Sequence, residues 1–487
     1  MKKTIKAIWI IPLVWVIVGC STTGVDDVGG WESMPQSGVY GEKYMEYEEN
    51  PFQDVSEKPI STFSIDADGA AYANMRRYVN LGQRPPKESV RIEEFINYFT
   101  FDYAEPPQEE SISLNSEVAR CPWNDKHLLL RVGVKGKTII EDLLPPSNYV
   151  FLIDVSGSMN SPDKLGILKT GFKTMVDNLK DNDKVAIVIY AGRARVLLNS
   201  TSADQKEVIQ NAINELGAGG STAGHDGISK AYEIAKENFI EGGNNRIILG
   251  SDGDFNTGPS SVKELIELVE SKKDEGIFIT VLGVGGGNLN DHMAEQIANK
   301  GNGTYEYIDN AEQIEKVFVN ERSKFYAVAK DVKLQLTFNE DAVKSYRLIG
   351  YENRLLENQD FEDDEKDAGE IGVGQTITAM YEIIPATVLE KNTIIALGSY
   401  DARYKKADEE ISRPLSTTLA SNVLDIDKSS ENMRFAAAVT AYGLILRESE
   451  YKGNADMQMV LDLSGQATSF DPYGYRKGFI ELVNKLK

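Results

Sequence analysis

Apolar and polar positions in the middle of the chain alternate between two patterns. Short, almost wholly apolar runs occupy residues 149–154, 185–190, 246–250, 277–284 and 304–308. Amphipathic segments separate these runs, and in the first of them apolar residues recur at helical spacing from Leu165 to Leu179. Apolar runs that alternate with amphipathic helices are typical of a parallel sheet covered on both faces. We therefore expect a doubly wound, mainly parallel α/β domain over residues 146–325.

The segments on both sides of this domain show a period of two instead. Apolar residues alternate with other residues at Leu128, Leu130, Val132 and Val134, and again at Val332, Leu334, Leu336 and Phe338. Further strand-like pieces follow at residues 376–384 and 393–400. Such alternation predicts strands with one buried face. We expect residues 109–145 and 326–420 to form one β-sandwich, into which the α/β domain is inserted.

Two regions with helical patterns complete the predicted body. Residues 51–108 contain a short strand-like piece at 62–65 and helical spacing at 72–81 and 89–99, which predicts a separate N-terminal region. Residues 421–487 predict a helical C-terminal region. Its first helix is rich in alanine and strongly apolar, so it should pack closely in a core.

The N-terminus resembles a bacterial lipoprotein signal. Three lysines precede an apolar run over residues 8–18, which is too short to span a bilayer but suits a secretory signal. The run is followed by Gly-Cys, as in the lipobox, in which the cysteine receives diacylglycerol and becomes the new N-terminus. We expect residues 1–19 to be removed and Cys20 to carry the lipid. The alternative is an ordinary signal peptide followed by a chance cysteine.

The residues after Cys20 define how the body would be attached. Residues 20–50 are mostly polar, acidic or glycine, which predicts a flexible tether. No later segment is long and apolar enough to cross a membrane. We therefore expect a cell-envelope protein, periplasmic or surface-exposed, that is held to a membrane only by its lipid anchor.

The net charge limits the classes of partner that we expect, and the cysteine content limits the possible disulfides. The formal net charge of −23 repels phosphate backbones, so we expect no nucleic acid partner. It also repels anionic lipids, so membrane attachment requires the anchor. Cys20 and Cys121 are the two cysteines, and acylation of the first leaves the second without a disulfide partner in the chain. We expect Cys121 to be a small buried hydrophobe.

Oxygen-bearing side chains follow the predicted strands at three places. Asp154, Ser156 and Ser158 lie on the turn after the first apolar run. Thr222 lies in a glycine-rich loop, and Asp252 follows the third run. Because the carboxyl ends of parallel strands meet at one edge of a sheet, we expect these five side chains to meet there.

This set of donors suits a hard divalent cation. Carboxylate and hydroxyl oxygens favour Mg²⁺, with Ca²⁺ or Mn²⁺ as alternatives, over Zn²⁺ or Cu²⁺. Two carboxylates balance the charge of such an ion. Five potential ligands leave at least one position of an octahedral shell for water or for a partner's group.

The same residues resemble a known family. Asp-x-Ser-x-Ser, a later threonine and Ser-Asp-Gly are similar to the metal-ion-dependent adhesion site of von Willebrand factor type A domains, which have a Rossmann-like α/β fold. The resemblance implies that Asp154, Ser156 and Ser158 are metal ligands, and that Thr222 and Asp252 complete the shell directly or through water. It also implies a non-enzymatic protein-binding module, in which an Asp or Glu carboxylate of the protein ligand completes the metal shell.

Three residues near this motif depart from the family pattern. His225 and Asp226 stand where the loop after the threonine is usually small and rich in glycine. His225 either approaches the metal or is exposed without a role, and we expect the second. Asp254 is expected to be a turn residue beside the ligand Asp252.

A narrower resemblance covers nearly the whole mature chain. Five segments are similar to the bacterial YfbK-type lipoproteins: residues 61–66, 91–99, 121–123, 350–354 and 474–480. This resemblance implies family-specific N-terminal and C-terminal regions around the von Willebrand factor type A domain. It defines the architecture better than the activity.

Other function classes stay open. Asp66 and Asp68 lie in a motif similar to that of haloacid-dehalogenase-type phosphatases, in which the first aspartate attacks phosphorus. The strand before Asp66 is short, however, and no doubly wound sheet is predicted to follow it. The three histidines fit no recognisable nucleophilic arrangement. A further alternative is an envelope scaffold whose metal is structural or absent.

Two other patterns have an ordinary interpretation. The acidic run at residues 361–370 predicts a solvated loop, with a calcium site as the alternative. The glycine-rich run at residues 283–287 follows a strand but lacks the dinucleotide-binding fingerprint, so we expect a loop.

Overall fold

The computed structural model describes residues 36–37, 41–220, 224–253, 258–272, 275–388 and 394–487. The predicted signal peptide, Cys20, Thr222 and Asp254 lie outside these residues. Among the helices within them, none has the length and the apolar character that crossing a bilayer requires.

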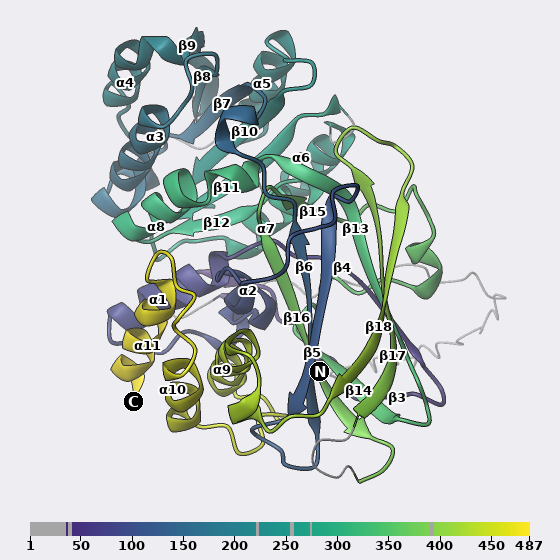
Figure 1. Cartoon of the computed structure of the whole chain (residues 1–487). Helices are drawn as coiled ribbons and strands as arrows, with labels where there is room; N and C mark the ends of the chain where they lie inside the picture. Colours follow the sequence, from purple (N-terminus) through teal and green to yellow (C-terminus); the bar gives the residue numbers. More distant parts are fainter. Residues whose placement is uncertain (1–35, 38–40, 221–223, 254–257, 273–274, 389–393) are drawn as a thin grey trace, which may run out of the picture. The chain divides into compact units, whose positions relative to one another are not determined.

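A six-stranded sheet in the order β12-β11-β10-β7-β8-β9 forms the centre of the α/β domain (Figure 1). Its strands are β7 (Ser147–Asp154), β8 (Lys184–Ala191), β9 (Arg193–Ser202), β10 (Asn244–Ser251), β11 (Phe278–Val284) and β12 (Tyr305–Ile308). Neighbouring strands are parallel except for β8 and β9. The predicted mainly parallel α/β fold is confirmed. Strand β9 was not predicted, because it is a half-exposed edge strand without an apolar run.

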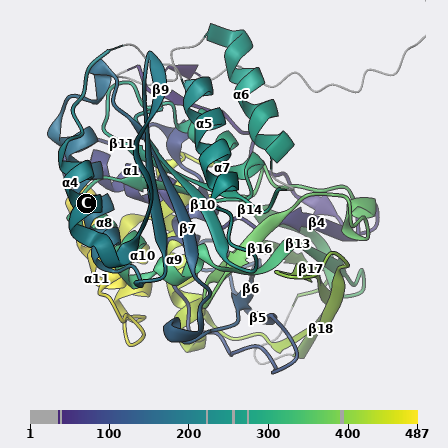
Figure 2. The ribbon, with the colours of Figure 1, turned by 90° about the horizontal axis from the view of Figure 1, so that it is seen from above.

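Helices cover both faces of this sheet, so the fold is doubly wound as predicted. They are α3 (Ile167–Asp177), α4 (Lys206–Asn214), α5 (Gly224–Glu237), α6 (Gly258–Lys272), α7 (Asp291–Lys300) and α8 (Ala311–Glu315). On one face, the Phe151 ring of β7 stacks on Phe172 of α3 with centroids 4.4 Å apart. On the other, Leu152 shares a core with Ile228 of α5. Helices α3 and α4 thus lie opposite α5, α6 and α7 (Figure 2).

Two five-stranded antiparallel sheets share a second part of the core. The first contains β15 (Gly369–Gly372), β13 (Ala327–Phe338), β17 (Ile394–Lys406), β18 (Arg413–Asn422) and β4 (Ile60–Ser64), and the second contains β3 (Gln53–Asp54), β14 (Val343–Ile349), β16 (Thr376–Pro385), β6 (Leu128–Gly136) and β5 (Ile112–Arg120). Strand β6 precedes the α/β domain and pairs with β16, which follows it. The chain on both sides of the α/β domain therefore builds the same sheets.

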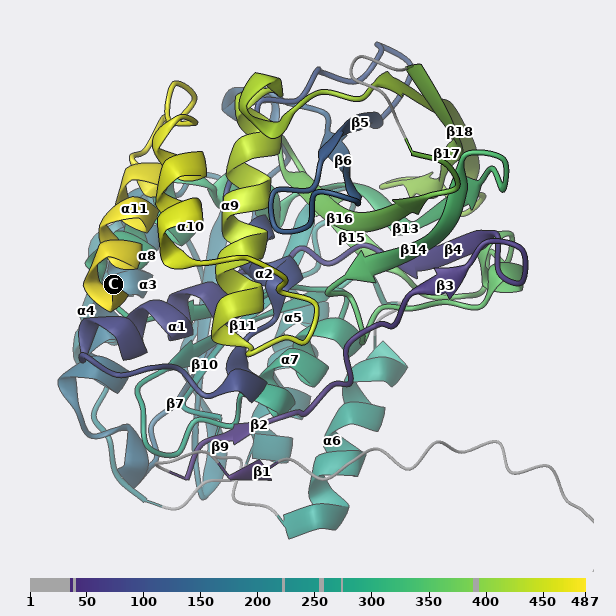
Figure 3. The ribbon, with the colours of Figure 1, turned by 90° about the horizontal axis from the view of Figure 1, so that it is seen from below.

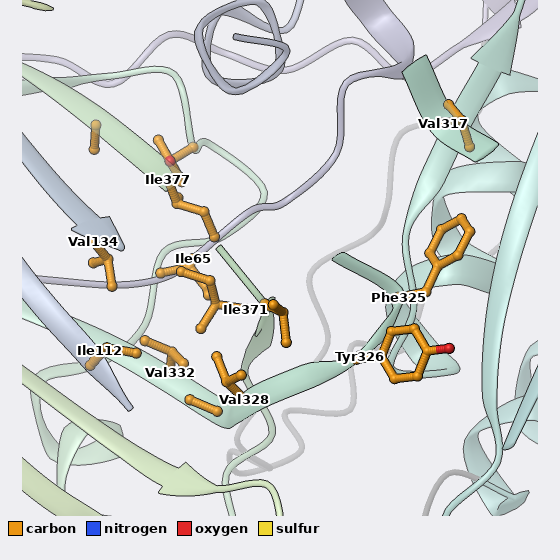
Figure 4. Close-up of a cluster of buried hydrophobic side chains, with 14 of the residues drawn as sticks. Ile65, Ile112, Val134, Val317, Phe325, Tyr326, Val328, Val332, Ile371 and Ile377 are labelled. Carbon is orange, nitrogen blue, oxygen red and sulfur yellow. The ribbon is translucent and has the colours of Figure 1, made fainter. Parts of the chain in front are cut away.

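The N-terminal region is not separate from these sheets, which corrects the predicted boundary at residues 51–108. Strand β4 pairs with β13 and β3 pairs with β14. Both strands are short, and the register of β4 is set by pairing with a partner more than 250 residues away, which local periodicity cannot reveal. Figure 4 shows Ile65, just after β4, among Val332 and Ile371 of the first sheet and Val134 and Ile377 of the second.

Strand β6 is buried on both faces, although its alternating pattern predicted one solvated face. Leu128 and Leu130 face the core between the sheets, whereas Leu129 belongs to a different core. That second core is formed by helices, which cover the outer face of β6. Leucine at both kinds of position in β6 is the sequence signal of this double burial.

A helical layer combines the N-terminal and C-terminal regions (Figure 3). Its helices are α1 (Ala70–Asn80), α2 (Ile92–Asn97), α9 (Glu431–Leu446), α10 (Met457–Gly465) and α11 (Tyr475–Leu486). The alanine-rich α9 is buried on nearly all sides, as predicted. Cys121 is free and buried in this core, and burial raises the pKa of its thiol, which confirms the expected structural role.

The predicted tether over residues 20–50 is wrong for its last part. Residues 41–50 pack against the body: Glu42 is buried and bonds to Arg77, and the backbone N–H of Lys43 donates to Leu289. Tyr44 is also buried. The acidic composition of this segment suggested a tether, but it does not show that Glu42 forms a buried ion pair or that Tyr44 is buried.

Candidate metal centre

The carboxyl edge of the parallel sheet brings Asp154 and Asp252 together. Asp154 is the last residue of β7, and Asp252 follows the last residue of β10. The two strands are hydrogen-bonded neighbours with Ile153 opposite Gly250. The hydroxyl of Ser251 donates to Oδ2 of Asp154 over 3.2 Å. Parallel pairing in this register therefore places both predicted carboxylates at the same edge, as expected.

The turn after β7 places two serines beside Asp154. Oδ1 of Asp154 accepts the backbone N–H of Ser156 over 2.8 Å. The hydroxyl oxygens of Ser156 and Ser158 lie 3.1 Å apart. Ser156 is buried and Ser158 is exposed. The turn thus presents a carboxylate and two hydroxyls in one cluster that is open to solvent at Ser158.

The glycine-rich loop reaches the same turn. Gly219 N–H donates to the carbonyl of Val155 over 2.7 Å, and Gly157 N–H donates to the carbonyl of Gly220 over 3.0 Å. Thr222 itself lies outside the described residues, two positions after Gly220. The backbone bonds place the beginning of its loop directly against the Asp154 turn.

The two aspartates of the site are fully buried. Burial raises the pKa of Asp154 to about 6, and the nearby charge of Asp252 adds to the rise, while hydrogen bonds from Ser156 oppose it. Burial disfavours the charged carboxylate, and a positive charge beside it would favour that charged form. Oxygen donors that surround such a carboxylate fit a hard divalent cation, which would supply the missing charge.

Lys164 is a part of the site that the sequence did not reveal. Its Nζ lies 3.0 Å from Oδ2 of Asp252 and 2.6 Å from Oδ1 of Asn288, whose amide also donates to Asp252 over 3.0 Å. The lysine is nearly buried in a π-helical turn, Pro162–Gly166. Its side chain passes over Gly285, where a Cβ would lie 2.4 Å from Cγ of Lys164. An intramolecular cation therefore already neutralises one of the two predicted carboxylates.

His225 and Asp226 lie on the first turn of α5, whereas the sequence analysis placed them in a loop. His225 is 45% exposed and lies 4.0 Å from the carboxylate of the exposed Asp226. Residues 283 and 284 end β11, and residues 285–287 form the loop after it, which receives Lys164 and accepts the hydroxyl of Tyr307 at the carbonyl of Gly285.

The sequence analysis also raised two alternative sites, a phosphatase motif at Asp66 and a calcium site at residues 361–370. Asp66 follows β4 of an antiparallel sheet and is buried with Oδ2 bonded to Nε of Arg354 over 3.1 Å. A phosphatase nucleophile at the edge of a doubly wound sheet is therefore excluded. The acidic run at residues 361–370 contributes no group of three metal-binding side chains within the described chain, whereas Asp66, Asp68 and Glu94 do form such a group.

Comparisons with known proteins match three parts of the chain. The model described as von Willebrand factor type A domain matches residues 148–320. The model described as von Willebrand factor matches residues 39–131, and the one described as "Uncharacterized protein YfbK, C-terminal" matches residues 323–487. A domain of the first type implies a protein-interaction module.

Similar proteins extend this result over most of the chain. "Uncharacterized protein YfbK" of Escherichia coli (strain K12) is 39% identical over 469 residues, which covers 91% of this chain and 80% of that protein. Among solved structures, a von Willebrand factor type A protein from Catenulispora acidiphila covers 76% of this chain and 89% of its own, at 17% identity and a TM-score of 0.45. The ArnB paralog VWA2 from Sulfolobus acidocaldarius covers 77% and 97%, at 16% identity and a TM-score of 0.39. The chain belongs to the YfbK family, with a von Willebrand factor type A domain at its centre.

Proposed function

We propose that this chain is a non-enzymatic, metal-dependent protein-binding module. In this proposal Asp154, Ser156, Ser158, Thr222 and Asp252 hold one divalent cation, Mg²⁺ or else Ca²⁺ or Mn²⁺. A protein ligand supplies an Asp or Glu carboxylate to the open position. The observation that carries the proposal is the convergence of the Asp154 turn, the beginning of the Thr222 loop and Asp252 at one edge of the sheet.

The surroundings of the site favour an anionic ligand. When bound, the cation would attract and orient a carboxylate more strongly than any single protein group. Lys164 adds a second positive charge, and Ser158 is exposed, so a ligand can reach the site from solvent. Because Lys164 offsets one of the two buried carboxylates, the metal keeps net positive charge toward the ligand.

We also propose that the body is attached to a membrane of the cell envelope through a lipid on Cys20. The apolar run before Cys20 and the polar segment after it support this attachment. The net charge of −23 opposes both a nucleic acid partner and direct binding to anionic lipid.

Affinity capture from envelope extracts tests the proposed function. The full chain should capture a protein in Mg²⁺ and release it in EDTA, and Asp154→Ala should capture none in either condition. Asp204→Ala, an exposed aspartate before α4, is the control and should capture as the wild type does. Equal capture by wild type and Asp154→Ala would reject the metal-dependent function.

The bond between Lys164 and Asp252 favours one alternative, a scaffold that needs no metal. The ammonium group satisfies Asp252 without a divalent ion, so the loops could keep their arrangement in its absence. Capture that survives both EDTA and Asp154→Ala would support this alternative.

A further inference from the structure

Three buried carboxylates outside the candidate metal centre converge on one point. Asp66 and Asp68 lie between β4 and α1, and Glu94 lies on α2. One oxygen from each lies within 4.8 Å of the others, and the three residues are at most 2% exposed. Oxygens that bind one Ca²⁺ at about 2.4 Å lie at most about 4.8 Å apart, so this spacing fits a single ion.

Two carboxylate oxygens at this place have no hydrogen-bond donor among the described residues. One is Oδ2 of Asp68, and the other is Oε2 of Glu295, which lies on α7 and is 2% exposed. The nearest guanidinium nitrogens, on Arg354 and Arg91, lie 3.7 Å away from these oxygens, which is too far for a hydrogen bond. Buried carboxylate oxygens are rarely left without a partner, so this arrangement indicates a missing cation.

The charges around the cluster do not balance. Asp66, Asp68, Glu94 and Glu295 face two guanidinium groups, those of Arg91 and Arg354. At least two negative charges are therefore in excess, and Asp291 shares Arg91 as well. A divalent cation would cancel an excess that is otherwise costly in a buried place.

We propose that Asp66, Asp68 and Glu94 bind a structural divalent cation, with Ca²⁺ favoured. Calcium accepts several carboxylates in irregular geometry, whereas Mg²⁺ keeps much of its water and demands an octahedron. Arg354 bonds to Oδ2 of Asp66 and Arg91 bonds to Oε1 of Glu94, and these bonds fix the orientation of both carboxylates. Glu295 supplies additional negative charge from the α/β domain.

The site would join three parts of the fold. Asp66 and Asp68 continue the β4 strand of the sandwich, Glu94 belongs to the helical layer, and Glu295 belongs to the α/β domain. Asp68 also accepts the backbone N–H of Tyr305, the first residue of β12, over 2.7 Å. A bound ion therefore stabilises the contact between the α/β domain and the rest of the chain.

Calcium binding by the full chain tests this proposal in an Asp154→Ala background, which removes the candidate metal centre. We expect this variant to bind one Ca²⁺ in equilibrium dialysis and to melt at higher temperature in millimolar Ca²⁺ than in EDTA. Adding Asp68→Asn should abolish both effects. An asparagine can still accept the Tyr305 N–H, so the fold keeps that bond. In EDTA the Asp68→Asn variant should melt no lower than its parent, because one excess negative charge is removed from a buried place.

Two further variants serve as a control and as a second test of the cluster. Asp183→Asn replaces a fully buried aspartate that also accepts backbone N–H groups, and it should keep the calcium effects. If Asp68→Asn does not fold, Glu94→Gln serves in its place, with the same expected losses. No bound Ca²⁺ in the Asp154→Ala parent, or calcium effects that persist in both cluster variants, would overturn the proposal. In the first case the carboxyl groups hold protons instead.

Discussion

Lys164 determines how the candidate metal centre behaves without a metal. Its ammonium group lies 3.0 Å from a carboxylate that is fully buried. Removing one partner of a buried ion pair is costly, because the other charge is left without compensation. Removing this cation also makes the site more negative, which favours a divalent ion. Loss of the lysine should therefore lower the stability of the metal-free chain and raise its affinity for a divalent ion, and the two quantities can be measured separately.

The variant Lys164→Gln should show this opposition. In EDTA it should unfold with about 3 kcal/mol less free energy than the wild type. Its affinity for Mg²⁺ should be about tenfold higher, which corresponds to about 1.4 kcal/mol. Urea unfolding and isothermal titration measure the two quantities. Lys173→Gln, on the neighbouring α3, is the control and should change neither. An unchanged Mg²⁺ affinity in Lys164→Gln would contradict this role of the lysine.

Glu370 should make stability depend on pH. Burial raises its pKa to about 8, and the charges of Asp367 and Asp331 add to the rise. Between its ordinary pKa of 4.5 and about 8, the folded chain holds a proton that the unfolded chain has lost. The stability that this group contributes is therefore present at low pH and is lost as the pH rises through this window.

The variant Glu370→Gln removes that dependence. At pH 9 we expect the Glu370→Gln protein to be about 1–2 kcal/mol more stable than the wild type. The expected gain is no larger because Glu370 keeps some exposed surface, where solvent screens its charge. The two should be nearly equal at pH 5. Urea unfolding across this range measures the difference. Parallel stability profiles for the two proteins would show that Glu370 ionises normally.

The site residues that the sequence revealed are those carried by strand ends. Asp154, Ser156, Ser158 and Asp252 were placed at one edge because parallel strands align their carboxyl ends. Lys164 was not found, because its contact depends on a turn before α3 and on the positive φ of Gly285 in a distant loop. Contacts of this kind are made by tertiary packing and leave no periodic signal.

At the scale of elements, α9 and α2 approach each other at Gly443. A Cβ at this position would lie 2.9 Å from Cγ1 of Ile92, near the branch of a stiff side chain. Alanine favours a helix over glycine by about 1 kcal/mol, but overpacking costs about 1–3 kcal/mol. Gly443→Ala should therefore destabilise the chain by about 1 kcal/mol.

The matched control is Gly478→Ala on α11. Nothing lies within 4 Å of a Cβ at Gly478, so the helix preference acts alone and should stabilise the chain by about 0.5–1 kcal/mol. Urea unfolding compares the two variants. A stabilising effect of Gly443→Ala would show that α9 and α2 can move apart at little cost.

The elements that were difficult to predict are the short and edge strands. The α/β sheet could be predicted from long apolar runs such as β7 and β10, because a strand that is buried on both faces is apolar at nearly every position. Strands β3, β4 and β9 were missed or misassigned, because their partners rather than their composition define them. The outer face of β6 was misjudged because the helices that cover it come from the other end of the chain.

At the scale of the whole chain, α7 connects the two charged sites. The backbone N–H of Asn290, just before α7, donates to the carbonyl of Asp252 over 3.4 Å. Asp291 and Glu295, on the first turns of α7, face Arg91 and the buried carboxylate cluster. A change in the position of α7 would therefore affect both the candidate metal centre and the contact with the sandwich.

The central claim is that five oxygen-bearing residues hold one divalent ion at the edge of the α/β sheet. A crystal structure of the chain in millimolar Mn²⁺ tests it most directly, because the anomalous signal locates the ion. We predict a peak within about 2.6 Å of the hydroxyl oxygens of Ser156 and Ser158, with Asp154, Thr222 and Asp252 around it. A structure with no peak at this edge, in which Lys164 still holds Asp252, would contradict the account.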